Sequence, residues 1–354
     1  MERYAYSGRN TSTESAHGAQ ADKNHCNIKI QVLEDLDAMA GNIAFHHVYG
    51  TPLIVTAGVD RIRLRRRPLI ETDQCLSGKV TWVGNSSMEI RMQCVEEGSD
   101  EEWLEAYFTF VTLDPDTKKP VAMPALLPQT QEERAHFELG ALKAHAKKAR
   151  RRNKLTVGEQ LTEASLQVDR QAGALLVEAG PLLRMPSLAD PNSILMSSTH
   201  MQNAMIAQPQ ALNLHNRIFG GFLMRRAFEL AFATAYVFGG AKPKFLEVDD
   251  ISFESPVDVG DLLVFNSRVL YTMPNGGFLG DYVEDHVNCP LITVEVEAWV
   301  TEPEKAYAKI SNHFYFTFCL PEGTPCRKVL PANIDEARRM ATRMAADMEQ
   351  AAQC

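Results

Sequence analysis

An apolar run from Gly220 to Gly240 is hydrophobic on almost every side of a helix. Other elements must enclose such a helix, because a surface helix keeps one polar face. Gly239 and Gly240 are expected to end it, since glycine readily adopts the left-handed conformation of a helix stop. Gly220 and Gly221 are expected to leave the first backbone N–H groups open to a ligand oxygen. The pattern predicts a buried helix whose start can contact a ligand carbonyl or phosphate.

The same pattern occurs twice along the chain. Each half has a helical run with an acidic residue inside it, at 31–49 and at 220–238. A Val-Asp-x-Ile tetrapeptide follows at 59–62 and again at 248–251, and Tyr-Phe-Thr-Phe occurs at 107–110 and at 315–318. An ordered set at an offset of about 190 to 210 residues indicates a duplicated domain, since solenoid repeats are far shorter.

Alternating apolar and polar positions predict strands after each helix. The predicted strands are 61–69, 76–83, 88–95 and 103–113 in the first half, and 245–253, 262–272, 291–300 and 307–319 in the second. One helix enclosed by a strongly curved antiparallel sheet is the hotdog architecture. The predicted fold class is α+β, with tandem hotdog domains forming an intramolecular pseudo-dimer.

The second half also has a predicted strand before its helix, around 198–208, whereas residues 1–27 are mostly polar and are expected to be a disordered tail. Two alternatives follow: the first hotdog domain, 28–120, lacks its first strand, or the chain starts too late to include it. A partly helical linker is expected over 121–195, with helices at 129–153 and 157–172. The second hotdog domain is expected over 196–322, followed by a helical tail over 323–354.

Composition narrows the function classes. The chain has 354 residues, of which 45% are hydrophobic and 23% charged, and its net charge is −9. This acidity disfavours nucleic-acid or membrane-surface partners, and the basic stretch at 147–154 is expected to be a charged helix end. Seven scattered cysteines predict reduced thiols and an intracellular protein, and no metal site is expected. No membrane span or secretory signal is expected.

Several short sequence motifs together resemble those of the double-hotdog acyl-coenzyme A thioesterases, over roughly 31–320. The matching motifs are at 32–37, 76–84, 86–89, 216–225 and 248–251. The resemblance implies hydrolysis of a fatty acyl-CoA to free acid and coenzyme A where the two hotdogs meet, with no further cofactor. It implies that backbone N–H groups at one helix start polarise the thioester carbonyl, while a carboxylate on the partner helix acts as base or nucleophile. It also implies oligomers of double-hotdog units and a mitochondrial location, although 1–27 is a poor presequence; the cytoplasm is the alternative.

In the family, the catalytic carboxylate stands seven residues after the position of the second glycine. Asp37 stands seven residues after Ile30, the matching position in the first half. It shares a helical face with Leu33 and Ala40, so burial is expected to raise its pKa. We therefore predict one working site, with the catalytic Asp37, Asn213 and Gly221 and with Gly220 beside coenzyme A.

The other half-site is expected to be incomplete. Residues 27–30 contain no glycine pair, and Phe228 occupies the plus-seven place of the second half. Glu229 comes one residue late, and is expected to be a satisfied structural acid or half of a degenerate site. This missing glycine turn supports an alternative function, a non-catalytic acyl-CoA-binding or scaffold protein. Acyl-chain length does not follow from the pattern.

Arginines alternate along the first predicted strand, so Arg61, Arg63 and Arg65 are expected on one face. Guanidinium groups suit bidentate phosphate binding, which makes this face a candidate for the coenzyme A phosphates. The alternative is the solvated outer face of an antiparallel strand.

Overall fold

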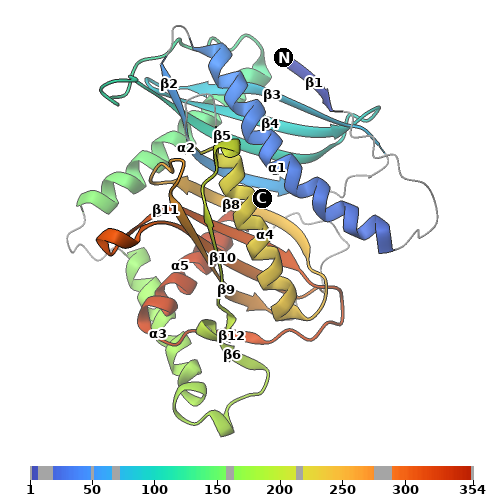
Figure 1. Cartoon of the computed structure of the whole chain (residues 1–354), viewed down its shortest axis with the longest axis vertical. Coiled ribbons are helices and arrows are strands. Elements are labelled where there is room, and N and C mark those ends of the chain that lie inside the picture. Colours follow the sequence, from blue (N-terminus) through green and yellow to red (C-terminus); the bar gives the residue numbers. More distant parts are fainter. Residues whose placement is uncertain are drawn as a thin grey trace.

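The structure is a computed structural model that describes residues 2–6, 19–48, 52–65, 72–156, 163–212, 218–274 and 289–351. In these residues a ten-stranded antiparallel sheet carries helices on both faces (Figure 1). The first hotdog contains β1 (Glu2–Tyr6), α1 (Ala19–His47), β2 (Leu53–Leu64), β3 (Gln74–Val83), β4 (Ser87–Glu96) and β5 (Glu102–Leu113). The second contains β7 (Met201–Ile206), α4 (Gly220–Gly239), β8 (Lys244–Phe253), β9 (Leu262–Met273), β10 (Leu291–Glu302) and β11 (Tyr307–Cys319).

Other elements connect and follow the two hotdogs. They are the helices α2 (Gln131–Thr156), α3 (Glu163–Arg184) and α5 (Ile334–Ala351), the short strands β6 (Ser193–Leu195) and β12 (Lys328–Leu330), and the 3-10 turns η1 (Pro186–Leu188), η2 (Met196–Thr199), η3 (Pro209–Ala211) and η5 (Pro303–Lys305). The strands β6 and β12 form a separate parallel pair.

The strand order confirms the duplication. It runs β1-β3-β4-β5-β2-β8-β11-β10-β9-β7, so each strand of the first hotdog has its counterpart at the mirrored place in the second. The two Val-Asp-x-Ile tetrapeptides pair with each other at the centre of the sheet: Val59 faces Ile251 and Ile62 faces Val248. The repeated tetrapeptides therefore lie at the pseudo-twofold axis of an intramolecular pseudo-dimer, as the predicted hotdog fold requires.

The helices α1 and α4 lie on the same face of the sheet (Figure 1). Their apolar residues recur every three or four positions and are buried against the strands, among them Leu33, Leu36 and Ala40 of α1. Gly240 ends α4 in the predicted left-handed conformation, with a φ of 63°. At the other end Phe219 makes no side-chain cap, so the first N–H groups of α4 stay open to partners from elsewhere.

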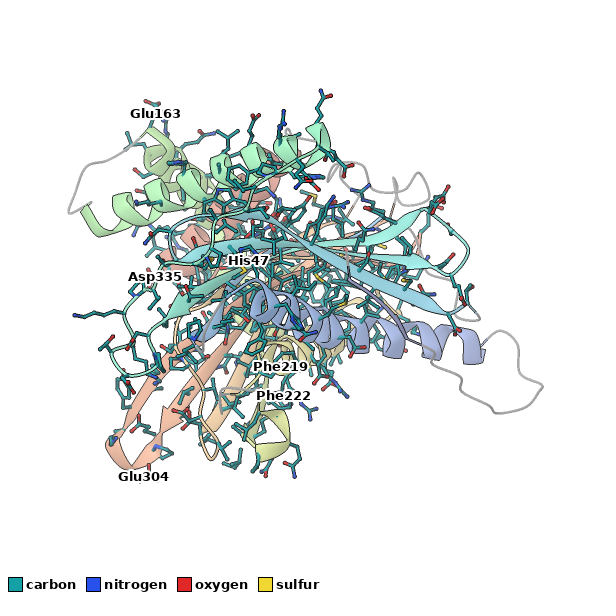
Figure 2. All side chains as sticks on the ribbon, turned by 90° about the horizontal axis from the view of Figure 1, so that it is seen from above. His47, Glu163, Phe219, Phe222, Glu304 and Asp335 are labelled. Atoms are coloured by element: carbon teal, nitrogen blue, oxygen red, sulfur yellow. The ribbon has the colours of Figure 1, made fainter. Side chains whose placement is uncertain are left out.

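The opposite face of the sheet is covered by the helices outside the two hotdog repeats. Figure 2 shows α2 and α3 on the side of the sheet away from α1. Lys143 of α2 pairs with Glu89 of β4, and Arg339 of α5 pairs with Glu297 of β10. Each hotdog thus has a charged outer helix, one from the predicted linker and one from the predicted tail.

Two predicted segments differ from the structure. Residues 1–27 were expected to be disordered, but β1 pairs with the edge of β3 and α1 already begins at Ala19. Pairing with an open sheet edge gives β1 backbone partners that a polar composition does not reveal. Hotdog 1 therefore has its first strand, at the place that β7 takes in hotdog 2.

Element boundaries differ elsewhere. The strand predicted at 61–69 begins earlier, at Leu53, and ends at Leu64. The second linker helix was predicted at 157–172, but it runs from Glu163 to Arg184 and includes Pro181. Its length reflects packing against α5, where Arg338 pairs with Asp169, and not local propensity.

Candidate active site

The start of α4 meets the middle of α1, and this contact joins two predicted site residues. The Gly221 N–H donates a 2.7 Å hydrogen bond to Oδ2 of Asp37, across 184 residues of chain. A Cβ at Gly221 would lie 3.0 Å from Cα of Glu34, and one at Gly220 would lie 2.9 Å from Oδ2 of Asp37. The glycine pair is therefore what lets the backbone of α4 approach α1 this closely.

Thr56 on β2 is the second partner of Asp37. Its hydroxyl donates to Oδ1 of Asp37 at 3.3 Å. Thr56 was not among the predicted site residues, because the strand was predicted to start at 61. The run of apolar and β-branched residues from Leu53 to Ala57 was the signal that would have extended the strand back to Thr56.

Burial dominates the electrostatics of Asp37. The side chain is 1% exposed, and this desolvation raises the pKa of Asp37 from 3.8 to about 6. The hydrogen bonds from Gly221 and Thr56 oppose the rise, because they stabilise the charged form. A carboxylate with a pKa near neutrality can accept a proton at physiological pH. The bare helix start beside it favours an anionic oxygen.

The equivalent place in the second hotdog is filled by aromatic rings. Phe228 stands where Asp37 stands, and Phe245 stands where Thr56 stands: Thr56 pairs with Phe110 and Phe245 pairs with the equivalent Phe318. The Phe228 and Phe245 rings meet edge to face with centroids 5.0 Å apart. A carboxylate and hydroxyl pair in one hotdog is thus replaced by apolar packing in the other.

Glu229 is held in ion pairs on the exposed flank of α4. Arg225 contacts it at 3.2 Å and Arg226 at 2.9 Å, and its side chain is 33% exposed. Arg225 also contacts Glu34 of α1 at 3.0 Å, which ties the two helices together near Gly221. Of the two alternatives for Glu229, these contacts favour the satisfied structural acid.

Arg65 is the remaining predicted site residue whose side chain the structure describes, and it does not join this group. Arg65 donates to Glu105 at 2.6 Å, on the face of the sheet opposite the buried Ile62 and Leu64. The side chains of Arg61 and Arg63 lie outside the described part of the structure, as does Asn213. A role for the arginines with coenzyme A stays a prediction.

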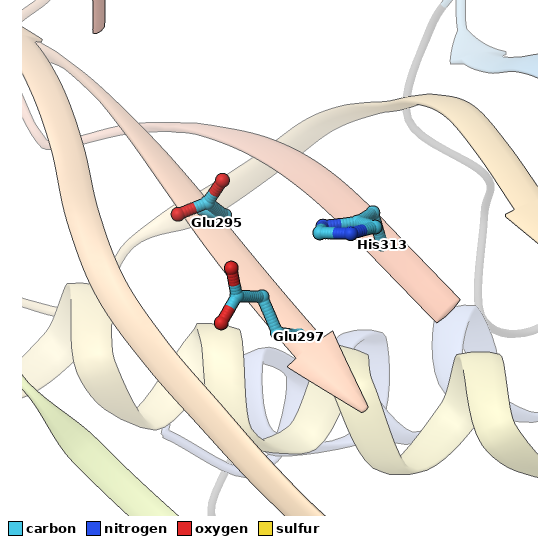
Figure 3. Close-up of side chains that lie close together, drawn as sticks. All are labelled: Glu295, Glu297 and His313. Carbon is cyan, nitrogen blue, oxygen red and sulfur yellow. The ribbon is translucent and has the colours of Figure 1, made fainter. Parts of the chain in front are cut away.

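One group outside the helix layer has donor atoms that suit a metal ion. Glu295 and Glu297 of β10 point toward His313 of β11 (Figure 3). Both carboxylates are already paired with Arg339 and with Arg268. The equivalent pair to Glu295 and His313 in the first hotdog is the Arg91 and Glu105 salt bridge, joined at 2.6 Å. The strand register therefore makes this group the counterpart of an ion pair, and its two carboxylates are themselves held in ion pairs with arginines.

Curated relatives were found over most of the chain. Acyl-coenzyme A thioesterase 4, mitochondrial, from Humulus lupulus is 43% identical over 338 residues, which is 90% of this chain and 60% of the relative. Acyl-coenzyme A thioesterase 2, chloroplastic, from the same plant is 41% identical over 90% of this chain and 74% of the relative. The human acyl-coenzyme A thioesterase 9, mitochondrial, is 34% identical over 83% of this chain and 66% of the relative. No protein-family model matches the chain.

These identities, on a tandem hotdog fold, show that the chain belongs to the acyl-coenzyme A thioesterase family. They confirm the resemblance that the short sequence motifs indicated. The chain spans only about three fifths of the mitochondrial Humulus relative, at 60% of its length. None of the described helices combines the length and hydropathy that a bilayer crossing requires.

Proposed function

We propose that this chain hydrolyses acyl-CoA thioesters to a free carboxylic acid and coenzyme A. The reaction takes place where α1 and α4 meet. The observation that supports this most strongly is the hydrogen bond from the Gly221 N–H to Asp37, because a backbone N–H group and a buried carboxylate from different hotdogs meet there. Family membership supports the same reaction class. Coenzyme A enters as part of the substrate, and no cofactor takes part.

The proposed chemistry begins with an exchange of hydrogen-bond partners. The thioester carbonyl oxygen takes the Gly221 N–H that Asp37 now accepts, and the developing oxyanion is stabilised there. Asp37 then loses a hydrogen bond that lowers its pKa, so it becomes a stronger base. It removes a proton from water as the water oxygen adds to the carbonyl carbon. When the tetrahedral intermediate collapses, the C–S bond breaks and the sulfur takes that proton.

Asn213 is proposed to hold the water or the thioester, as the family resemblance implies. Thr56 is proposed to orient Asp37 through its hydroxyl hydrogen bond. The site is proposed to occur once per chain, because Phe228 and Phe245 offer neither a base nor a hydrogen bond at the equivalent place.

The test is release of free thiol from acetyl-, butyryl-, octanoyl- and palmitoyl-CoA by the purified protein. We expect the wild type to hydrolyse part of this series and Asp37→Asn to lose about a hundredfold or more in kcat, the usual range for a general base. Glu229→Gln is the matched control: it also neutralises a helix carboxylate, and it is expected to stay within about threefold of wild type, because exposed pairs contribute little.

Two results would overturn the proposal. If Glu229→Gln abolished activity while Asp37→Asn kept it, the working site would belong to the other half. If the wild type bound acyl-CoA and hydrolysed none of the series, the chain would be the acyl-CoA-binding scaffold that the incomplete half-site favours.

Assembly and location extend the proposal. We propose an oligomer of double-hotdog units, supported by apolar side chains that α3 and the turn after it leave exposed, including Val177 at 80% and Leu188 at 75%. Light scattering of the purified chain would show a mass well above that of one chain.

We propose a mitochondrial location from the names of the relatives, to be tested by fractionation of cells that express the full protein.

A further inference from the structure

One helical turn beyond Asp37, α1 carries Gly41. A glycine inside a helix is unfavourable relative to alanine, because it loses more backbone freedom on folding. A Cβ at Gly41 would meet no atom within 4 Å, so no packing within the described chain requires a glycine. Gly173 and Gly180 of α3 share this property. The glycine alone is therefore not evidence of function. The residues around Gly41 decide whether this position has a functional role.

The second hotdog has a phenylalanine at the equivalent place. Phe232 follows Phe228 by four residues, as Gly41 follows Asp37. The Phe232 ring contacts the Phe228 ring at 6.2 Å between centroids and the Phe318 ring at 6.1 Å. Where the second hotdog closes this side of its helix with two stacked rings, the first has a carboxylate followed by an open position.

The open side continues along α1 as an apolar strip. Phe45 follows Gly41 at helical spacing, so the two residues share one flank of α1, and Val48 stands one residue past the end of the helix at His47. Phe45 is 44% exposed, and Val48 is partly buried against the core. None of the three residues carries a charge. An apolar strip that begins one turn from the carboxylate suits a hydrocarbon chain and not the coenzyme A phosphates.

We propose that this flank, formed by Gly41, Phe45 and Val48, receives the acyl chain of the substrate, and that Gly41 sets how long a chain fits. The inference rests on the proposed function, because it takes the thioester to be held at Asp37 and Gly221. It names the specificity-determining position of that site. A bulky side chain at 41 would close the flank as Phe232 closes its counterpart, leaving room only for short acyl groups.

The test compares kcat/KM for acetyl-, butyryl-, octanoyl- and palmitoyl-CoA in the wild type and in Gly41→Phe. We expect about a tenfold or larger loss for the longest acyl group that the wild type accepts, because each buried methylene contributes to binding. The value for the shortest accepted group is expected to stay within about twofold. Gly173→Phe, at an equally open glycine of α3, is the matched control and is expected to change neither value.

A second variant covers the case in which Gly41→Phe fails to fold. Phe45→Asp lies at a half-exposed position and places a charge on the flank, which is expected to lower kcat/KM selectively for long acyl groups. An equal loss at every chain length, or no loss in either variant, would overturn the inference while leaving the hydrolase intact. A wild type that hydrolyses none of the four thioesters would overturn the proposed function and this inference together.

Discussion

Replacing Asp37 by asparagine is expected to stabilise the fold while removing activity. The carboxylate is buried, and burial holds its pKa at about 6 instead of 3.8. The folded chain therefore opposes ionisation at this position. Asparagine keeps nearly the same shape and stays neutral. Its amide oxygen can accept from the Gly221 N–H, and its NH₂ group can donate to the Thr56 hydroxyl.

The size of the effect follows from the pKa. The contribution of Asp37 to folding is fully present below pH 3.8 and is lost as the pH rises toward about 6, because the folded state binds the proton more tightly. At 1.36 kcal/mol per pH unit, the loss is about 1.6 kcal/mol at pH 5 and about 3 kcal/mol at pH 7 and above. These values are upper bounds on the gain in Asp37→Asn, because the amide is a weaker acceptor than the carboxylate.

Urea unfolding of the wild type and Asp37→Asn at pH 5, 6, 7 and 8 measures the effect. The difference in free energy of unfolding should grow by more than about 1 kcal/mol between pH 5 and pH 7 and then level off. Glu229→Gln removes a partly exposed carboxylate that is held in ion pairs, and it should show no such growth. A difference that stays constant with pH, or that shrinks as the pH rises, would refute the statement that burial raises the pKa of Asp37.

Three further predictions concern the same site and the core. Thioester hydrolysis by the wild type should rise with pH and level off above about 6, since the base must be ionised; Thr56→Val removes a bond that lowers the pKa of Asp37 and should move this midpoint to higher pH in rate profiles. Gly221→Ala would place a Cβ 2.6 Å from Cε1 of Phe219, and kinetic assays should show a loss of about tenfold or more in kcat. Arg343→Met leaves two buried carboxylates without their cation and should lower the free energy of unfolding by about 3 kcal/mol or more in urea titrations. An unchanged midpoint, full activity or wild-type stability, respectively, would contradict each.

Much of the fold was predictable because the sequence contains an internal duplication. Chance similarity between two short segments is common, but an ordered series of repeated motifs is not. Two of those motifs pair with each other across the pseudo-twofold axis, at Val59 and Ile251. The strand at 307–319 was predicted at its observed bounds, and it is rich in the aromatic residues that favour strands. The first strand was not predicted, because β1 depends on the free edge of β3 and not on its own composition.

The candidate site was predictable only in part. Asp37 was identified through the family resemblance, which implies a carboxylate seven residues after the position of the second glycine, and Gly221 was identified through the glycine pair that opens the apolar helix. Thr56 was not found, because a single hydroxyl in a strand carries no signal until the partner helix is in place. The aromatic filling of the second half-site likewise required the register that aligns Thr56 with Phe245.

One site is proposed to form between the two hotdogs, with Asp37 from one and Gly221 from the other. A crystal structure of Asp37→Asn with a non-hydrolysable acyl-CoA analogue tests it most directly. We expect one analogue per chain, with its carbonyl oxygen within hydrogen-bond distance of the Gly221 N–H and its acyl carbon beside residue 37. An analogue bound beside Phe228, or two bound per chain, would contradict it.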